Sequence, residues 1–228
     1  MESGKLYIVA TPIGNMEDMT FRAVRLLGEV DLILCEDTRT TRHLLKHYDI
    51  KTPCESYNSH ATTAKSDRCI KLLEEGKTLA LVSDAGTPCI SDPGVHLVRQ
   101  VRDLLPEVQV LAVPGPSALV AALSVSGVPA SEFTFLGFLP HKKGRETLFK
   151  MIAGSELPVA FYESPHRIEK ALASLVSILP AEAKVVVCRE LTKIFEECVS
   201  GSAQEVLDYF TNNSEKVRGE FVVIVSPK

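Results

Sequence analysis

Residues 78–94 read TLALVSDAGTPCISDPG, and this stretch decides the expected fold class. Its first five residues form a short continuous apolar run, which is typical of a strand buried on both faces of a parallel sheet. The chain then changes to small residues, prolines and two aspartates, Asp84 and Asp92. Because a simple turn needs only two or three such residues, a loop of this length at a strand end indicates a ligand-binding segment.

The segments around this stretch repeat the same alternation. Short apolar runs predict strands at 6–10, 30–37, 78–83 and 108–113. Helical periodicity and capping residues predict helices at 20–27, 39–48, 63–75, 93–105 and 118–126. Strands that alternate with helices in this way predict a parallel sheet with helices on both faces.

The second half of the chain has a different order of elements. Apolar runs predict strands at 133–140, 157–163, 184–191, 194–201 and 219–225. Ser164 is expected to cap a helix whose first residue is Pro165, and Ser202 with Glu205 predicts a capping box for a second helix. Because consecutive strands with a short link favour antiparallel pairing, we expect a mixed sheet here.

We therefore expect an α/β protein with two α/β domains. The N-terminal domain is expected to span residues 1–138 with a mostly parallel sheet, and the C-terminal domain residues 139–228 with a mixed sheet. The expected junction carries the basic sequence HKKGRE at 141–146. This sequence predicts either a contact with RNA or a solvated hinge.

The composition is that of an ordinary soluble globular protein. Of 228 residues, 45% are apolar and 24% are charged, and the net charge is −4. This balance excludes a general nucleic-acid coat protein but not a local basic patch. No apolar run approaches the roughly 20 residues of a membrane span, and the start, MESGKLYIVATP, lacks the regions of a secretory signal. Six scattered cysteines without a CxxC pair predict reduced thiols in a cytoplasmic protein rather than disulfides or a zinc site.

The unusual residues gather where the predicted strands end, and ligands of open α/β sheets bind at the carboxyl ends of strands. The loop after residue 81 contains no Lys or Arg up to residue 94, and GxGxxG and GxxxxGK[ST] are absent, so a nucleotide phosphate is a poor fit. An adenosine that carries a positive group, such as S-adenosyl-L-methionine, fits better, with Asp84 holding ribose or amino groups. The alternative is a tight structural loop. His43 and His47 stand one helical turn apart, but Leu44 follows the first and no third ligand is near, so we expect no metal.

Five segments together resemble the tetrapyrrole methylase superfamily. These segments are LYIVATPIGN (6–15), CEDTR (35–39), SDAGTPCISDPG (83–94), VPGPSA (113–118) and FYESPHR (161–167). Within the superfamily they are most similar to the members that methylate the ribose 2′-oxygen of a cytidine in the decoding region of 16S ribosomal RNA. The resemblance implies a homodimer without metal, and S-adenosyl-L-methionine bound between two domains. Members of this kind usually continue into a further helical segment, which is expected to contact RNA, whereas the given sequence ends at Lys228.

The resemblance also implies which residues bind the methyl donor. The N-terminal domain is expected to contribute Thr11, Pro12, Ile13, Gly14, Asp84, Ala85, Gly86, Thr87, Pro116 and Ser117. The C-terminal domain is expected to contribute Tyr162, Glu163, Arg189, Glu190, Leu191, Gly219 and Glu220.

Catalytic and substrate-binding candidates follow from the chemistry of methyl transfer to a ribose hydroxyl. This hydroxyl is a weak nucleophile, so a base or a polarising cation is expected nearby, and Glu36, Asp37 and Arg39 at the end of the second predicted strand are the candidates. The structural alternative is that Asp37 only caps the following helix and pairs with Arg39. RNA contacts are expected from Arg39 and from Arg22, Arg25, Arg42, His60, His166 and Arg167.

Two other functions are weighed against RNA methylation. The first is a tetrapyrrole C-methyltransferase of the precorrin or uroporphyrinogen type. Such an enzyme is expected to carry a Gly-Asp-Pro sequence in its third loop, whereas this chain has SDAGTP. A non-enzymatic nucleotide-binding module would bind the donor without transferring a methyl group. We rank RNA methylation first, with ribosomal RNA of the small subunit as the expected partner.

Overall fold

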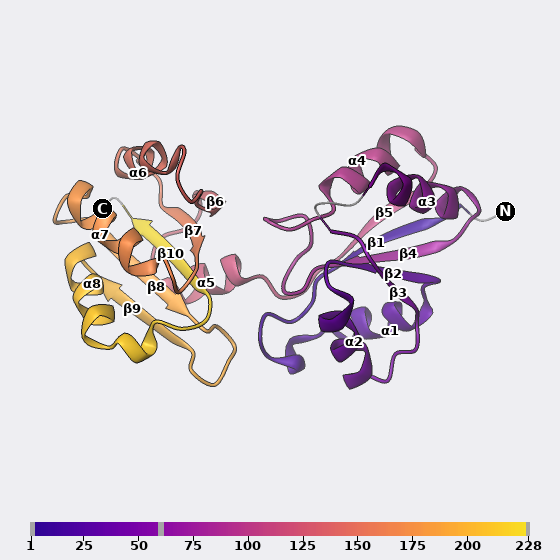
Figure 1. The fold of residues 1–228 in the computed structure, drawn as a ribbon, viewed down its shortest axis with the longest axis horizontal. Helices are drawn as coiled ribbons and strands as arrows, with labels where there is room; N and C mark the ends of the chain where they lie inside the picture. Colours follow the sequence, from indigo (N-terminus) through magenta and orange to yellow (C-terminus); the bar gives the residue numbers. More distant parts are fainter. Residues whose placement is uncertain (1–2, 59–61, 227–228) are drawn as a thin grey trace. The chain divides into compact units, whose positions relative to one another are not determined.

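The computed structural model describes residues 3–58 and 62–226. The chain divides into two compact units, Met1–Ser117 and Ala118–Lys228, and each is described by itself (Figure 1). The second unit begins earlier than the domain boundary expected after residue 138, because two elements of the intervening segment pack in it. Strand β6 (Thr134–Phe138) pairs with the second sheet, and helix α5 (Ala118–Ser126) contacts the same sheet.

The first unit is built on a five-stranded sheet in which every strand pair is parallel. The strands are β1 (Lys5–Val9), β2 (Leu32–Cys35), β3 (Cys54–Ser56), β4 (Thr78–Val82) and β5 (Gln109–Val113), in the order β3-β2-β4-β1-β5. This confirms the parallel sheet expected from the continuous apolar runs. The short edge strand β3 was not expected, because its three residues include no apolar run and all are partly exposed.

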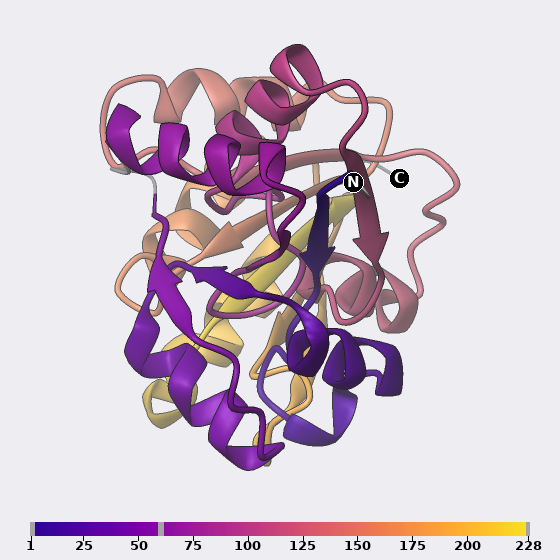
Figure 2. The same ribbon diagram turned by 90° about the vertical axis from the view of Figure 1, so that its right-hand side faces the viewer.

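Helices cover both faces of this sheet, as Figures 1 and 2 show. The helices are α1 (Phe21–Glu29), α2 (Thr38–His47), α3 (Thr63–Glu74) and α4 (Val95–Leu104), with a short 3-10 turn, η1, at Met16–Asp18. One core joins α1 and α2 to side chains such as Val9 and Ile33, and the other joins α3 and α4 to Leu6 and Leu79. Successive residues of β1 and β2 therefore serve opposite cores, which explains why these strands are apolar throughout.

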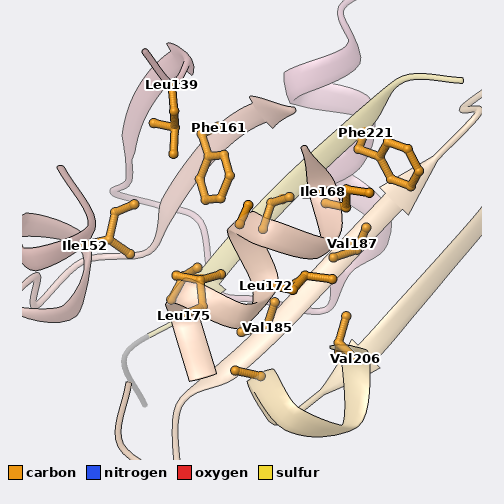
Figure 3. Close-up of a cluster of buried hydrophobic side chains, with 14 of the residues drawn as sticks. Leu139, Ile152, Phe161, Ile168, Leu172, Leu175, Val185, Val187, Val206 and Phe221 are labelled. Carbon is orange, nitrogen blue, oxygen red and sulfur yellow. The ribbon is translucent and has the colours of Figure 1, made fainter. Parts of the chain in front are cut away.

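The second unit contains a mixed sheet, which confirms the second expectation of fold class. Its strands are β6, β7 (Val159–Glu163), β8 (Lys184–Arg189), β9 (Glu197–Gly201) and β10 (Phe221–Ser226), in the order β6-β7-β10-β8-β9. Only the β6–β7 pair is parallel. Helices α6 (Arg145–Ala153), α7 (Ile168–Ile178) and α8 (Ala203–Asn212) pack on one face around Phe161, as Figure 3 shows. A 3-10 turn, η2, follows at Ser214–Lys216.

The starts of α6 and α7 differ from the sequence patterns, whereas the start of α8 agrees with its pattern. Helix α7 begins at Ile168 rather than at Pro165, because residues 165–167 form a turn in which the N–H of Arg167 donates to the carbonyl of Ser164. Helix α6 was not expected, since it follows the polar segment at 141–144. The capping box of α8 is present, with the Ser202 side chain accepting from the N–H of Glu205.

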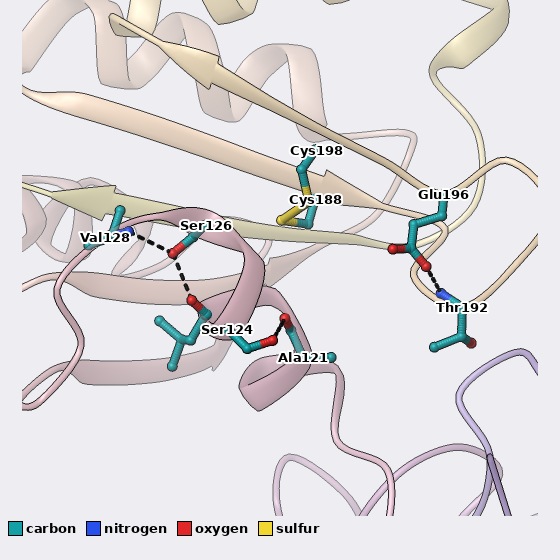
Figure 4. The surroundings of a disulfide bond; sticks show 9 residues. Ala121, Ser124, Ser126, Val128, Cys188, Thr192, Glu196 and Cys198 are labelled. Carbon is teal, nitrogen blue, oxygen red and sulfur yellow. Dashed lines mark hydrogen bonds between the residues drawn. A yellow bond between two sulfur atoms is a disulfide. The ribbon is translucent and has the colours of Figure 1, made fainter.

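A disulfide joins Cys188 to Cys198 across strands β8 and β9, as Figure 4 shows. The expectation of reduced thiols throughout was wrong for this pair, whereas Cys35, Cys54 and Cys69 are free, as is Cys89. The spacing of ten residues did not reveal the pairing, because it arises from the antiparallel register that sets the two cysteines opposite each other with their Cα atoms 4.2 Å apart. Within the described ranges, no helix combines the length and apolar character that crossing a membrane requires.

Candidate active site

The strand-end loops of the first unit are fastened to one another by backbone hydrogen bonds. Thr11, which follows β1, donates its N–H to the carbonyl of Gly86 over 2.9 Å and accepts the N–H of Gly86 over 3.0 Å. The buried Thr11 hydroxyl donates to the carbonyl of Ser83 over 3.1 Å. The loops after β1 and β4 are therefore held together by hydrogen bonds, although 75 residues separate Thr11 from Gly86.

Glycine is favoured at position 86 by the backbone conformation of this crossing. Its φ is 79°, a conformation that residues with a Cβ adopt at a cost. The next residue, Thr87, donates its hydroxyl to the carbonyl of Pro116 over 3.1 Å, so the loop after β5 joins the same cluster.

The rest of the loop after β4 has a strained backbone. Cys89 and Ser91 have φ values of 71° and 64°, which are uncommon for residues other than glycine. Gly94 has a φ of 124°, and an added Cβ would lie 2.4 Å from Cδ2 of Leu81. Backbone strain of about 1–3 kcal/mol per residue persists only where the surroundings enforce it, and it is concentrated at functional sites.

The polar groups at the surface of this cluster are suited to a ligand that carries hydroxyl or amino groups. Asp84 and Ala85 are exposed at the cluster's surface, so one carboxylate and a short stretch of unobstructed backbone face the solvent. Partial desolvation and the neighbouring Asp37 carboxylate raise the pKa of Asp84, and the carboxyl is partly held by the N–H of Asp37. Since the segment from residue 81 to residue 94 has no cation, it suits hydroxyl and amino groups better than phosphates.

Asp37 is held in place by the residues of the helix it caps. Its side chain accepts hydrogen bonds from the N–H of Arg39 over 2.8 Å and from Nη2 of Arg39 over 2.6 Å. These bonds lower the pKa of Asp37 to about 2. A carboxylate with so low a pKa is a weak base at neutral pH. The geometry is that of the structural alternative, in which Asp37 caps the helix and pairs with Arg39.

Glu36 differs from Asp37 in its hydrogen bonds and in the direction of its pKa shift. It is partly buried, and its carboxylate makes no hydrogen bond or ion pair within the described part of the chain. Burial, followed by the charges of Asp84 and Asp37, raises its pKa above the ordinary value. Its carbonyl accepts the hydroxyl of Ser56, which fixes the backbone at this strand end. Glu36 therefore has the environment of a general base, and Asp37 does not.

Two of the arginines expected to contact RNA, Arg22 and Arg39, lie at strand ends of the first unit. The Arg39 side chain is 88% exposed despite its pair with Asp37. Arg22 donates to the carbonyl of Ala112 over 3.1 Å, and Arg42 is exposed. Arg25 forms an ion pair with Glu29, four residues later in the same helix. His60 lies outside the described residues.

In the second unit, the structure brings together the loops that follow β8 and precede β10. Glu190 donates its N–H to the carbonyl of Glu220 over 3.2 Å, and Lys193 pairs with both carboxylates at 2.9 and 3.5 Å. Gly219 has a φ of 77°, and an added Cβ would lie only 1.8 Å from Oε1 of Glu190. Lys193 was not among the sequence candidates, because its role depends on a contact with a residue 27 positions away.

Two of the expected donor contacts are already committed to other partners. Arg189 is buried, and its Nη1 donates to the carbonyl of Phe195 over 3.0 Å and pairs with Glu197 at 3.4 Å. The Glu163 carboxylate has no exposed surface and pairs with Arg145 and Arg167. Arg145 was missed in the sequence because nothing local marks it as a partner of Glu163.

His166 is exposed, and Tyr162 packs its ring edge-on against Phe135 with centroids 5.0 Å apart. Leu191 is buried at the end of β8. Across residues 3–58 and 62–226, no three His, Cys, Asp or Glu side chains are grouped so that they could hold a metal ion.

The chain belongs to the tetrapyrrole (corrin/porphyrin) methylases, whose family model matches residues 5–207. Its most similar relatives include three proteins that are each named ribosomal RNA small subunit methyltransferase I. The one from Pseudomonas aeruginosa is 43% identical over 227 residues, which cover 99% of this chain and 80% of the relative. The one from Halalkalibacterium halodurans is 45% identical over 98% of this chain and 76% of the relative, and the one from Thermotoga maritima is 45% identical over 99% of both.

Solved structures share the fold at much lower sequence identity. A cobalt precorrin-4 methyltransferase superposes with a TM-score of 0.67 at 18% identity and covers 97% of this chain and 94% of its own. Uroporphyrin-III C-methyltransferase from Thermus thermophilus gives a TM-score of 0.66 at 18% identity, with 98% and 94% covered. These likenesses establish the fold alone, whereas the family membership confirms the resemblance carried by the five sequence segments.

Proposed function

We propose that this chain transfers a methyl group from S-adenosyl-L-methionine to the ribose 2′-oxygen of a cytidine in the decoding region of 16S ribosomal RNA. The observation that carries the proposal is the identity of 43–45% along almost the whole chain to relatives named for methylating small-subunit ribosomal RNA. The alternative is methylation of a tetrapyrrole carbon, and the solved tetrapyrrole methyltransferases that share the fold are 18% identical, which shows the fold alone.

The donor would be held by the fastened loops of the first unit. When bound, the donor would supply a methyl group that is carried on a sulfonium. Its sulfur would leave as a neutral thioether when an oxygen attacks the methyl carbon. Asp84 is suited to ribose hydroxyl or amino groups, and the backbone around Ala85 and Gly86 is open to close approach. We include Thr11–Gly14, Thr87, Pro116 and Ser117 of the first unit in this site.

Glu36 would act as the general base. When the ribose oxygen takes the methyl group from the donor, the Glu36 carboxylate would accept the proton that the hydroxyl loses. The carboxylate is free of hydrogen-bond partners in the described chain, and its raised pKa makes it a better acceptor than Asp37. Asp37 would hold Arg39 in place for the RNA backbone, together with Arg22 and Arg42.

The direct test is transfer of labelled methyl groups to small ribosomal subunits that lack the modification. Label that resists alkaline cleavage at one ribose of 16S ribosomal RNA is the expected result. Free ribosomal RNA and a tetrapyrrole precursor are run beside the subunits. Label in the precursor alone would replace the proposal with its alternative, and donor binding without any label would support a binding module.

The protein is also proposed to act as a homodimer, as the resemblance implies, and to be located in the cytoplasm, as its cysteine usage predicts. Light scattering coupled to size exclusion measures the mass of the particle directly. A mass of twice 24.9 kDa is expected, and a single-chain mass would reject the dimer.

A further inference from the structure

A basic loop joins β6 to α6 in the second unit, and its exposed residues are not part of the site proposed above. Residues Leu139–Arg145 read LPHKKGR. Leu139 is buried, whereas His141, Lys142 and Lys143 are exposed. Neither lysine forms an ion pair with another residue of 3–58 or 62–226, so both ammonium groups are available to an external anion.

This loop lies against a buried carboxylate that binds two arginines. Oε2 of Glu163 pairs with Nη2 of Arg145 at 2.7 Å, and Oε1 pairs with Nη2 of Arg167 at 2.8 Å. The Glu163 side chain is 0% exposed, and the two arginine side chains are 15% and 16% exposed. Oε1 also accepts the N–H of Ser164 over 2.9 Å.

The cluster of Arg145, Glu163 and Arg167 carries a surplus of one positive charge. Removing charged groups from water is costly, and the attraction within the cluster offsets that cost only where the geometry is good. One carboxylate cannot neutralise two guanidinium groups, which remain charged at all accessible pH values. The surplus adds to the positive potential of Lys142 and Lys143 beside it.

The two arginines also fix the backbone of the loop. Arg167 donates from Nη1 to the carbonyl of Leu139 over 2.9 Å and from Nε to the Ser164 hydroxyl over 3.2 Å. Arg145 donates from Nη1 to the carbonyl of Pro140 over 3.3 Å, and its N–H donates to the carbonyl of Lys142 over 3.2 Å. A loop held in this way at several points is not a hinge, although its sequence alone allowed that interpretation.

We propose that the loop Leu139–Arg145 binds phosphate groups of the ribosomal RNA substrate through Lys142 and Lys143, with Glu163 as the positioning residue that holds the loop in its binding conformation. The inference rests on the proposed function, because it specifies a second contact surface for the same substrate. A loop that is ordered before it binds loses less entropy on binding, so its lysines contribute more affinity than lysines on a mobile loop.

Binding of unmethylated small subunits, measured by filter retention between about 50 and 200 mM salt, tests the lysines. The variant Lys142→Ala/Lys143→Ala is compared with Lys150→Ala/Lys184→Ala, which removes the same charge from the same unit. The loop variant is expected to bind more weakly. Its plot of log affinity against log salt is expected to be less steep by about 2, since each phosphate that is no longer neutralised reduces the steepness by roughly 1. Its affinity for the donor and its kcat at saturating subunits are expected to stay unchanged. Equal affinity and slope in the two double variants would overturn the proposal.

Limited trypsin digestion tests the role of Glu163. Wild type is expected to resist cleavage after Lys142 and Lys143, and Glu163→Gln is expected to be cut there and to bind subunits as weakly as the double lysine variant. Resistance equal to wild type in Glu163→Gln would reject the positioning role. If that variant fails to fold, the lysine comparison still decides the phosphate contact.

The two proposals fail in different ways. Wild type that binds subunits through the loop but transfers no methyl group would reject the proposed function and leave the loop inference supported. Wild type that methylates subunits with unchanged affinity in the loop variant would reject the loop inference alone. Wild type that neither binds nor methylates subunits would reject both.

Discussion

The N–H of Asp37 donates a hydrogen bond to Oδ1 of Asp84 over 3.1 Å, and this bond ties the carboxyl end of β2 to that of β4. It draws the carboxylates of Glu36, Asp37 and Asp84 into one cluster, where their charges act on one another. The environments separate their pKa values: Arg39 lowers that of Asp37, whereas burial raises that of Glu36 and of Asp84. Such a separation is the pattern by which neighbouring carboxylates take different roles.

Glu36→Gln is expected to lower kcat by about 10²–10⁴-fold, because it removes the proposed proton acceptor while keeping the shape of the side chain. Since the folded-state pKa of Glu36 is raised, ionisation of this group disfavours the folded state, and the destabilisation develops as pH rises through the raised pKa. The amide is therefore expected to leave Tm at pH 7 equal to or above that of wild type. Single-turnover methyl transfer and calorimetry measure the two effects, and an unchanged kcat would remove Glu36 from catalysis.

Asp37→Asn is expected to weaken binding of the RNA more than chemistry. Asparagine caps a helix about as well as aspartate, so helix α2 should be kept, but the ion pair that orients Arg39 and its contribution to stability are removed. KM for small subunits should rise while kcat stays within about threefold, on the order of 0.7 kcal/mol in activation free energy. A loss of kcat as large as that of Glu36→Gln would instead make Asp37 the base.

The stability contribution of Asp37 has a defined pH window. Its folded-state pKa is about 2, below the ordinary 3.8, so the contribution is present above about pH 4 and is lost as pH falls through 2. The difference in Tm between wild type and Asp37→Asn should therefore shrink between pH 4 and pH 2. Thermal melts over that range check the window, and a constant difference would show that the ion pair with Arg39 adds no stability.

Gly219→Ala and Gly28→Ala form a matched pair with opposite expected signs. At Gly219 the added Cβ would lie 1.8 Å from Oε1 of Glu190 and the φ is 77°, so we expect a loss of about 1–3 kcal/mol and weaker donor binding. At Gly28, within α1, no atom lies within 4 Å of the added Cβ, so we expect a gain of about 0.5–1 kcal/mol. Denaturant unfolding measures both, and equal values would show that the close approach of Glu190 has no consequence.

The disulfide predicts how many cysteines react with an alkylating reagent before and after reduction. Alkylation of the unfolded, unreduced protein should label four cysteines, and reduction should raise the number to six. Reduction is expected to lower stability by up to about 3 kcal/mol, since Cys188 and Cys198 close a short loop. In Cys198→Ser the reductant should have no effect on Tm, and six labelled cysteines without reductant would disprove the bond.

Sequence reasoning recovered the features that local composition encodes. The parallel sheet followed from continuous apolar runs, and the clustered loops followed from polar residues at strand ends. Strand β3 was missed because three partly exposed residues give no apolar signal, and the Cys188–Cys198 bond was missed because it depends on strand register. The opposite pKa shifts of Glu36 and Asp37 could not be predicted either, because they depend on which carboxylate Arg39 reaches.

The cluster around Glu163 shows the same limit. The residues Arg145 and Glu163 are 18 positions apart, and neither belongs to a local pattern that predicts their pairing. The segment FYESPHR placed Glu163 at a strand end, but only the packing of α6 and the turn before α7 determines that the carboxylate faces two guanidinium groups.

Each sheet is assembled entirely from a continuous half of the chain, since β1–β5 end at Val113 and β6–β10 begin at Thr134. During synthesis, every pairing partner of the first sheet is therefore available while the second half is still being made. At about 5–20 residues per second, translation of the remaining residues takes on the order of ten seconds, which far exceeds the millisecond-to-second folding times of small domains. The nascent chain is thus expected to acquire its first sheet at the ribosome, before the strands of the second sheet are all available.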